Sequence, residues 1–86
     1  MLVTNRFKKD LKKAKKNAKQ DTGKLLEAIE ILADSGILPE AYLSHPLVGN
    51  WQSKWECHIQ PDFILIYEVS EKKLRLERCG SHSDLF

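Results

Sequence analysis

The feature that most constrains this chain is a run of strand-forming apolar residues in its second half. Residues 63–69 read Phe-Ile-Leu-Ile-Tyr-Glu-Val, which is typical of a central strand buried on both faces. The runs 55–59 and 74–79 alternate apolar and polar residues, as strands with one solvated face do. Pro61 and a turn at residues 70–72 separate these runs. The sequence therefore predicts a three-stranded antiparallel meander.

A short strand and an amphipathic helix are predicted at the start of the chain. Residues 1–3 are apolar and suit a first strand, and Thr4 or Asn5 can cap the helix that follows. Apolar residues then recur on one helical face, and lysines occupy the opposite side. The apolar residues of this face are Phe7, Leu11, Ala14 and Ala18.

A second helix is predicted to begin at Asp21 or Thr22 and to end at Gly36. The short joint between the helices favours an antiparallel pair. Residues 37–53 contain proline, glycine and asparagine, and we expect a long loop of the kind that often carries function. The expected inner face of the second helix consists of Leu25, Leu26, Ile29, Leu32 and Ala33.

The order strand–helix–helix–strand–strand–strand predicts an α+β fold, with a helix pair packed on one face of a small antiparallel sheet. The 86 residues suffice for one domain, residues 1–86, with one modest core. No apolar run approaches the ~18 residues of a membrane helix. The start, MLVTNRFKKD, lacks the pattern of a signal peptide. We therefore expect a cytoplasmic protein in which Cys57 and Cys79 are reduced thiols.

Charge is distributed unevenly along the chain, although the formal net charge is only +2. Residues 1–24 hold nine of the 14 basic residues and two of the 12 acidic ones. A local excess of this size can attract a polyanion. The alternative interpretation is a solvated helix face that serves only solubility.

The three histidines of the chain all lie in the C-terminal half, where they can meet a carboxylate. His45 precedes the meander, His82 follows it, and Asp62 begins its central strand. Because the ends of neighbouring antiparallel strands adjoin, we expect Asp62 to approach the segment that carries His82. Alternation places Trp55, Cys57 and Ile59 under the helices, and Glu56 and His58 on the open face.

Imidazoles grouped with a carboxylate suit proton transfer, because the histidine pKa lies near 6.5. A zinc site built from His45, His58, His82 and Asp62 is the alternative. None of the spacings resembles HxxxH or CxxC, so we expect no metal and no cofactor.

Three segments resemble the YafQ branch of the RelE/ParE toxin superfamily, the toxin halves of bacterial type II toxin–antitoxin pairs. They are SHPLVGNW (44–51), ECHIQPDFILIYEV (56–69) and LRLERCGSHSDLF (74–86). The resemblance implies a RelE-like fold and a ribosome-dependent endoribonuclease that cuts mRNA without metal. It also implies a cognate antitoxin that binds the toxin in a heteromer, whereas the free toxin is a monomer. The alternative is a catalytically inert relative, or one that acts on another target such as gyrase.

Carried over by position, the resemblance implies a site at His45, His58, Asp62, His82 and Phe86. We expect His82 to be the general acid and Asp62 or His45 to be the general base, with the alternative that Asp62 orients an imidazole instead. His58 and Arg78 would hold the phosphate. Phe86 and Phe63 would stack on a base.

Trp55 stands where relatives frequently carry a phosphate-binding arginine. We expect Arg78, Arg75 or Lys54 to supply that charge instead. On the basic helix, Lys12, Lys13 and Lys16 would dock on the phosphates of 16S rRNA with a salt-sensitive affinity.

Overall fold

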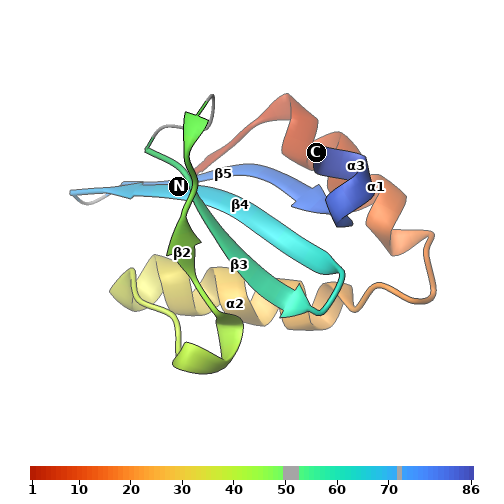
Figure 1. Ribbon diagram of the computed structural model, residues 1–86, viewed down its shortest axis with the longest axis horizontal. Coiled ribbons are helices and arrows are strands. Elements are labelled where there is room, and N and C mark those ends of the chain that lie inside the picture. Colours follow the sequence, from red (N-terminus) through yellow and green to blue (C-terminus); the bar gives the residue numbers. More distant parts are fainter. Residues whose placement is uncertain (50–52, 72) are drawn as a thin grey trace.

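The computed structural model describes residues 1–49, 53–71 and 73–86 of the chain. The sheet has the strand order β1-β5-β4-β3-β2, so the apolar run lies at its centre, as predicted (Figure 1). The predicted loop 37–53 and turn 70–72 extend over residues 50–52 and 72, which lie outside the described residues. The elements are β1 (Leu2–Val3), α1 (Asn5–Lys15), α2 (Thr22–Ser35), the 3-10 turn η1 (Glu40–Tyr42), β2 (His45–Pro46), β3 (Trp55–Gln60), β4 (Phe63–Ser70), β5 (Lys73–Gly80) and α3 (His82–Leu85).

The sheet is mixed, because β1 runs parallel to β5 while β2 to β5 pair antiparallel. Beyond β1, the chain continues to cover the outer edge of β5. The Thr4 N–H donates to Leu76 O at 3.1 Å, and its hydroxyl donates to Glu77 O at 2.7 Å. The Cys79 N–H then donates to the Asp10 carboxylate at 3.2 Å. The N-terminal segment therefore satisfies the edge of β5 almost to its end.

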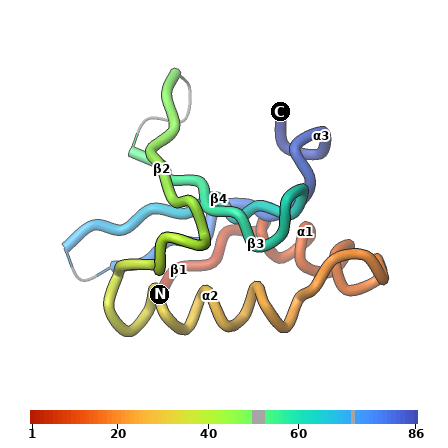
Figure 2. Tube along the Cα trace, turned by 60° about the horizontal axis from the view of Figure 1, so that its bottom comes forward, coloured from red at the N-terminus to blue at the C-terminus, as the bar shows by residue number. Residues whose placement is uncertain are grey.

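The helices α1 and α2 cover one face of the sheet, and α3 and the segment around β2 lie on the other side (Figure 2). This confirms the α+β class with the helix pair on one face. The main core lies between the helices and the sheet, and a smaller apolar cluster of Ile64, Ile66 and Leu85, with Leu47 against it, lies on the open face. Buried residues of the main core include Phe7, Leu25, Leu32, Cys57, Leu65 and Leu76.

Both long helices begin at the predicted caps, but their buried faces differ in part from the prediction. Thr4 caps α1 and Asp21 caps α2 with their side chains, and Gly36 ends α2 in the left-handed conformation with φ 75°. The helix α1 stops at Lys15, so Ala18 is exposed rather than part of the stripe. In α2 the buried face includes Ala28, whereas Leu26 and Ala33 are exposed. Among the described residues, none of the helices combines the length and apolar composition of a membrane crossing.

Three short elements were not expected from the sequence. The segment predicted as a loop contains η1 and the strand β2, and the C-terminal tail folds into α3. A strand of two residues is too short to show alternation, which explains why β2 was missed. The helix α3 has a sequence signal, because Ser81 and Asp84 have the spacing of a capping box and form one.

Candidate functional site: a row of imidazoles over a buried carboxylate

His82 is hydrogen-bonded to Asp62, as we predicted from the adjacency of neighbouring strand ends. The register places Gly80 opposite Ile64, so α3 starts beside the turn that carries Asp62. The Asp62 Oδ1 accepts the backbone N–H of His82 at 3.0 Å and lies 2.9 Å from its Nδ1. These two hydrogen bonds lower the pKa of Asp62. The hydrogen bond of its ring to Asp62 raises the pKa of His82, and the negative charge of Glu56 adds to this effect. Desolvation acts in the opposite direction and lowers the pKa.

Glu56 is the centre of the site, although the sequence analysis did not include it among the site residues. Its carboxylate is nearly buried, with an exposed side-chain fraction of 8%. One oxygen lies 3.4 Å from His58 Nε2 and 3.6 Å from His82 Nε2, and the other lies 3.8 Å from His45 Nε2. Three imidazoles therefore converge on one carboxylate.

The alternation of β3 placed Glu56 on the correct face but suggested that it would be exposed. It is buried because His45 of β2 and His82 of α3 lie over it, and both elements were missing from the prediction. Trp55 was expected under the helices, yet its side chain is 39% exposed. The sequence does contain a signal for Glu56: it is an acidic residue two positions before His58 and so lies on the same face of the strand.

The imidazoles form a continuous row with Phe86. Ring centroids are 6.2 Å apart between His45 and His58, and 5.7 Å apart between His58 and His82. The Phe86 ring continues the row at 6.5 Å from His82. His45 Nδ1 lies 3.0 Å from Leu43 O, and because a carbonyl only accepts, Nδ1 carries the hydrogen. In the neutral tautomer the lone pair of His45 is therefore on Nε2, the atom that lies 3.8 Å from the Glu56 carboxylate.

The two phenylalanines predicted to contact a base lie in very different environments. Phe86 is 59% exposed at the end of α3 and can present a ring to a ligand. Phe63 is only 1% exposed and belongs to the main core. The prediction for Phe63 is therefore wrong, because its ring faces packed side chains rather than solvent.

The three cations predicted to hold phosphate are each paired with carboxylates. The Arg78 guanidinium donates twice to Asp10, both times at 3.0 Å. A second network joins residues on and beside β3, β4 and β5, away from the ion pairs of the histidines. In this network the Lys54 ammonium lies 3.0 Å from Glu68 and 3.3 Å from Glu77, and Arg75 Nε donates to Glu77 at 2.6 Å.

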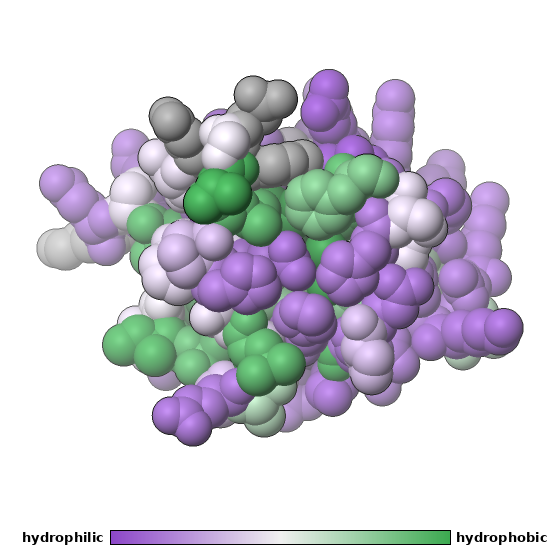
Figure 3. Space-filling view, in the orientation of Figure 1, coloured by the Kyte–Doolittle hydropathy of each residue, from purple (hydrophilic) through white to green (hydrophobic). Residues whose placement is uncertain are grey.

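The basic helix lies apart from the row but contacts α3. Lys12, Lys13 and Lys16 are exposed, as predicted. The Lys13 ammonium pairs with Asp84 at 3.2 Å, which links α1 to the turn that carries His82. Figure 3 shows the open face, where hydrophilic side chains gather across the middle between apolar groups, and long hydrophilic side chains project beside α1.

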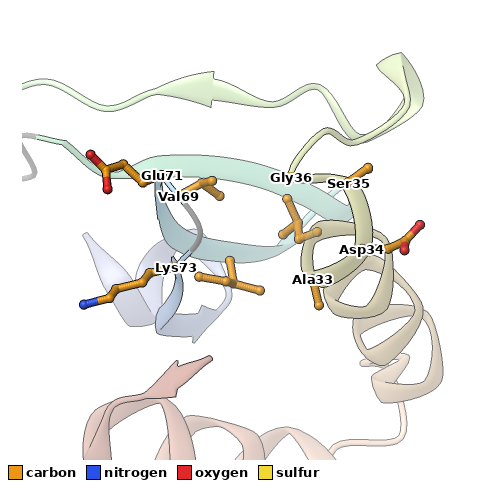
Figure 4. Close-up of a pocket in the computed structure, with 9 residues that line it drawn as sticks. Ala33, Asp34, Ser35, Gly36, Val69, Glu71 and Lys73 are labelled. Carbon is orange, nitrogen blue, oxygen red and sulfur yellow. The ribbon is translucent and has the colours of Figure 1, made fainter.

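A cavity of about 380 Å³ lies elsewhere, between the end of α2 and the hairpin of β4 and β5 (Figure 4). Its charged side chains are Asp34, Glu71 and Lys73, and no histidine is among its described lining residues. The described titratable groups of this cavity are two carboxylates and an ammonium, none of them an imidazole. The imidazole row is therefore the better candidate for proton-transfer chemistry.

Glu56, His58 and His82 also satisfy the geometry of a metal site. Each offers one ligand atom, and these three atoms lie within 4.8 Å of one another. Imidazole and carboxylate are ligands for zinc and copper. The set differs from the zinc alternative of the sequence analysis, because Glu56 replaces His45 and Asp62.

The fold and the row together define a small α+β protein that presents acid–base groups on an open sheet surface. The sequence matches, over residues 1–86, the family described as the bacterial toxin of type II toxin–antitoxin systems, YafQ. Over 84 residues it is 40% identical to the mRNA interferase toxin YafQ of Escherichia coli (strain K12), covering 96% of this chain and 90% of that protein.

Two solved structures extend this comparison. The toxin in an Escherichia coli DinJ–YafQ toxin–antitoxin complex matches with a TM-score of 0.89 and 38% identity, over 99% of this chain and 93% of that chain. A metal-bound toxin from Helicobacter pylori matches with a TM-score of 0.86 and 40% identity, over 100% of both chains. The chain belongs to the YafQ family of type II toxin–antitoxin toxins.

Proposed function

We propose that this toxin cleaves mRNA by acid–base catalysis across the imidazole row, with His82 as the acid and His45 as the base. The observation that carries the proposal is the pairing of His82 with Asp62 at one end of the row, with His45 held at the other end by the hydrogen bond of its Nδ1 to Leu43 O. The named activity of the Escherichia coli relative supports the same reaction.

His82 suits the role of general acid because its raised pKa increases the fraction of imidazolium at neutral pH. It donates a proton to the 5′-oxygen that leaves the scissile phosphate. Asp62 is a weaker base than an ordinary aspartate, because its pKa is lowered by the bonds to His82. We therefore propose that Asp62 positions His82 and that His45 is the base.

His45 accepts the proton of the 2′-hydroxyl at Nε2, since the bond from Nδ1 to Leu43 O fixes the tautomer. The 2′-oxygen then attacks the phosphorus, and the bond to the 5′-oxygen breaks. The products are a 2′,3′-cyclic phosphate and a 5′-hydroxyl, and one proton has moved from His82 to RNA for each proton taken by His45. General acid and base steps are each typically worth ~10²–10⁴-fold in rate.

His58 lies between the acid and the base, where its ring would donate a hydrogen bond to a phosphate oxygen. Arg78, Arg75 and Lys54 stay secondary candidates, because carboxylates already neutralise them. Phe86 would stack on a neighbouring base. The lysines of α1 would dock on 16S rRNA in a ribosome-dependent reaction.

We further propose that a cognate antitoxin binds this chain in a heteromer and that the free toxin is a monomer in the cytoplasm. The complex of the Escherichia coli relative with DinJ supports the partner. Cys57 and Cys79 are buried free thiols, and burial raises the pKa of each to about 12. Such thiols are unreactive and consistent with a reducing compartment.

The proposal is tested by inducing the chain in bacteria and mapping the 5′ ends of cellular mRNA. We expect new 5′-hydroxyl ends in phase with the reading frame and an arrest of growth. His82→Ala should abolish both, and His82→Gln should do so with less change in shape. Folded, soluble His82→Ala protein that still cuts mRNA at the wild-type rate would contradict the assignment. Arrest with intact mRNA and DNA-damage signalling would instead favour a gyrase-type target.

Metal binding is a second candidate property, favoured by the cluster of Glu56, His58 and His82. The metal-bound toxin from Helicobacter pylori supports it. A divalent ion in this position takes up the Nε2 lone pair of His82, so His82 could not hold the proton that cleavage requires. We therefore expect zinc or copper to inhibit the ribonuclease rather than to assist it.

Titration of the purified protein with Zn²⁺ or Cu²⁺ in a calorimeter tests this prediction. One ion should bind per chain and should lower cleavage at neutral pH, and a chelator should restore it. Glu56→Gln should weaken binding by roughly 10-fold or more, because it removes an anionic ligand. Cleavage that rises with bound metal would overturn the metal-free mechanism.

A further inference from the structure

A cleft of about 500 Å³, with charged and amide side chains as well as apolar surface in its walls, includes Asp62, the partner of His82. It lies where the turn between β3 and β4 meets the connection between α1 and α2 (Figure 1). Its volume falls within the range of about 300–1,000 Å³ that is usual for small-molecule sites. Lining residues on the helix side are Lys13, Asn17, Lys19 and Gln20, and those on the turn include Gln60 and Pro61.

Hydrogen bonds hold the two walls of this cleft in place. The Asp21 N–H donates to Gln60 Oε1 at 2.9 Å, which joins the start of α2 to the end of β3. Asn17 Oδ1 accepts the N–H of Lys19 at 2.9 Å, which shapes the connection between the helices. The cleft is therefore built before any ligand arrives.

The charged side chains of the cleft differ in whether they already have an oppositely charged partner. Asp62 is paired with His82, and Asp84 with Lys13 and the Ser81 cap. The Lys19 ammonium has no partner within the part of the chain that the structure describes. The Lys13–Asp84 pair is exposed, and exposed ion pairs are weak, so a phosphate can replace Asp84 as the partner of Lys13.

We infer that this cleft binds a nucleotide of the substrate RNA next to the scissile phosphate. Lys19, with Lys13, would contact its phosphate, the amides of Gln20 and Gln60 would face its base or sugar, and Pro61 offers an apolar surface. The inference rests on the proposed ribonuclease function, because only then does an RNA strand pass over Asp62. It gives the end of the basic helix a role toward the substrate itself, beyond docking on the ribosome.

Binding of a 2′-O-methyl RNA hexanucleotide, which lacks the nucleophile and is not cleaved, tests the inference. In NMR titrations of the full chain, we expect amide shifts at Lys19, Gln20 and Gln60. Lys19→Ala should weaken binding and should make the slope of log affinity against log salt shallower by about 0.7, the value for one phosphate of a single strand. The matched control is Lys9→Ala, which removes an exposed α1 lysine outside the cleft.

Equal salt slopes for Lys19→Ala and Lys9→Ala would overturn the inference, and so would the absence of shifts at the cleft amides of the wild-type protein at low salt. Both are readouts of binding and do not depend on cleavage. Loss of mRNA cutting in the induction experiment would instead count against the proposed function. A DNA oligonucleotide of the same base sequence separates binding through the phosphate backbone from contacts with the sugar. Amide shifts confined to the imidazole row with either oligonucleotide would also contradict binding in the cleft.

Discussion

At the scale of single residues, the site depends on how two carboxylates share one imidazole. Asp62 accepts from His82 at Nδ1, and Glu56 lies near its Nε2. The pKa of His82 is raised in the folded protein, first by the bond to Asp62. The protonated ring therefore stabilises the fold below its unfolded pKa near 6.5, and this contribution is lost as pH rises through the raised value.

Asp62→Asn should remove most of this pH dependence. We expect the free energy of unfolding of the wild type to fall as pH rises from about 6.5 to 8, and to fall less in the variant. Urea unfolding at several pH values measures the difference, and His45→Gln serves as the control for an imidazole that does not contact Asp62. Parallel curves for wild type and Asp62→Asn would show that the pair does not favour the imidazolium.

Much of this constellation was predictable from the sequence, and one central residue was not. The convergence of His58, His82 and Asp62 follows from alternation and from the adjacency of strand ends. Glu56 lay outside that reasoning, because alternation assigns a strand face but does not show what covers it. Phe63 was placed wrongly for the related reason that β4 is covered on both faces.

At the scale of elements, α3 carries both His82 and Phe86 on a single turn that cannot be stable alone. Its anchor is Leu85, which is 7% exposed and packs with Ile64 and Ile66 on the open face. The periodicity of apolar residues predicts neither the docking of α3 nor the strand β2. A periodic pattern needs several residues, and these two elements have at most four each.

Leu85→Ala should cost about 2–3 kcal/mol of stability, the lower part of the range for buried leucines, because the cluster around it is small. It should also reduce cleavage by displacing His82. Thermal unfolding and mRNA cutting test the two effects separately, and Val48→Ala at an exposed apolar position is the matched control. Unchanged cutting in a destabilised but folded variant would mean that the Asp62 bonds alone position His82.

At the scale of the whole molecule, charge is divided between a basic helix and an open face that carries acids among its imidazoles. Lys12→Ala with Lys16→Ala removes two exposed cations and leaves the buried Phe7 and Ala14 of α1 untouched. We expect unchanged unfolding, weaker ribosome binding and a salt slope lower by about 0.7–0.9 for each phosphate that the variant no longer binds. Sedimentation with ribosomes at several salt concentrations measures this, and an unchanged slope would make the helix a solvated face.

The covered edge of β5 has a consequence for assembly. A free strand edge is a template on which another chain can add a strand, in aggregates as well as in complexes. Here Thr4 and Asp10 occupy the donors and acceptors of β5 beyond β1. The opposite edge is β2, two residues long and closed by Pro46, which has no N–H to offer. A protein that adds a strand to this sheet is therefore expected on the side of β2 and β3, because β2 pairs with only Trp55 and Glu56 and the rest of β3 has no further strand beside it among the described residues.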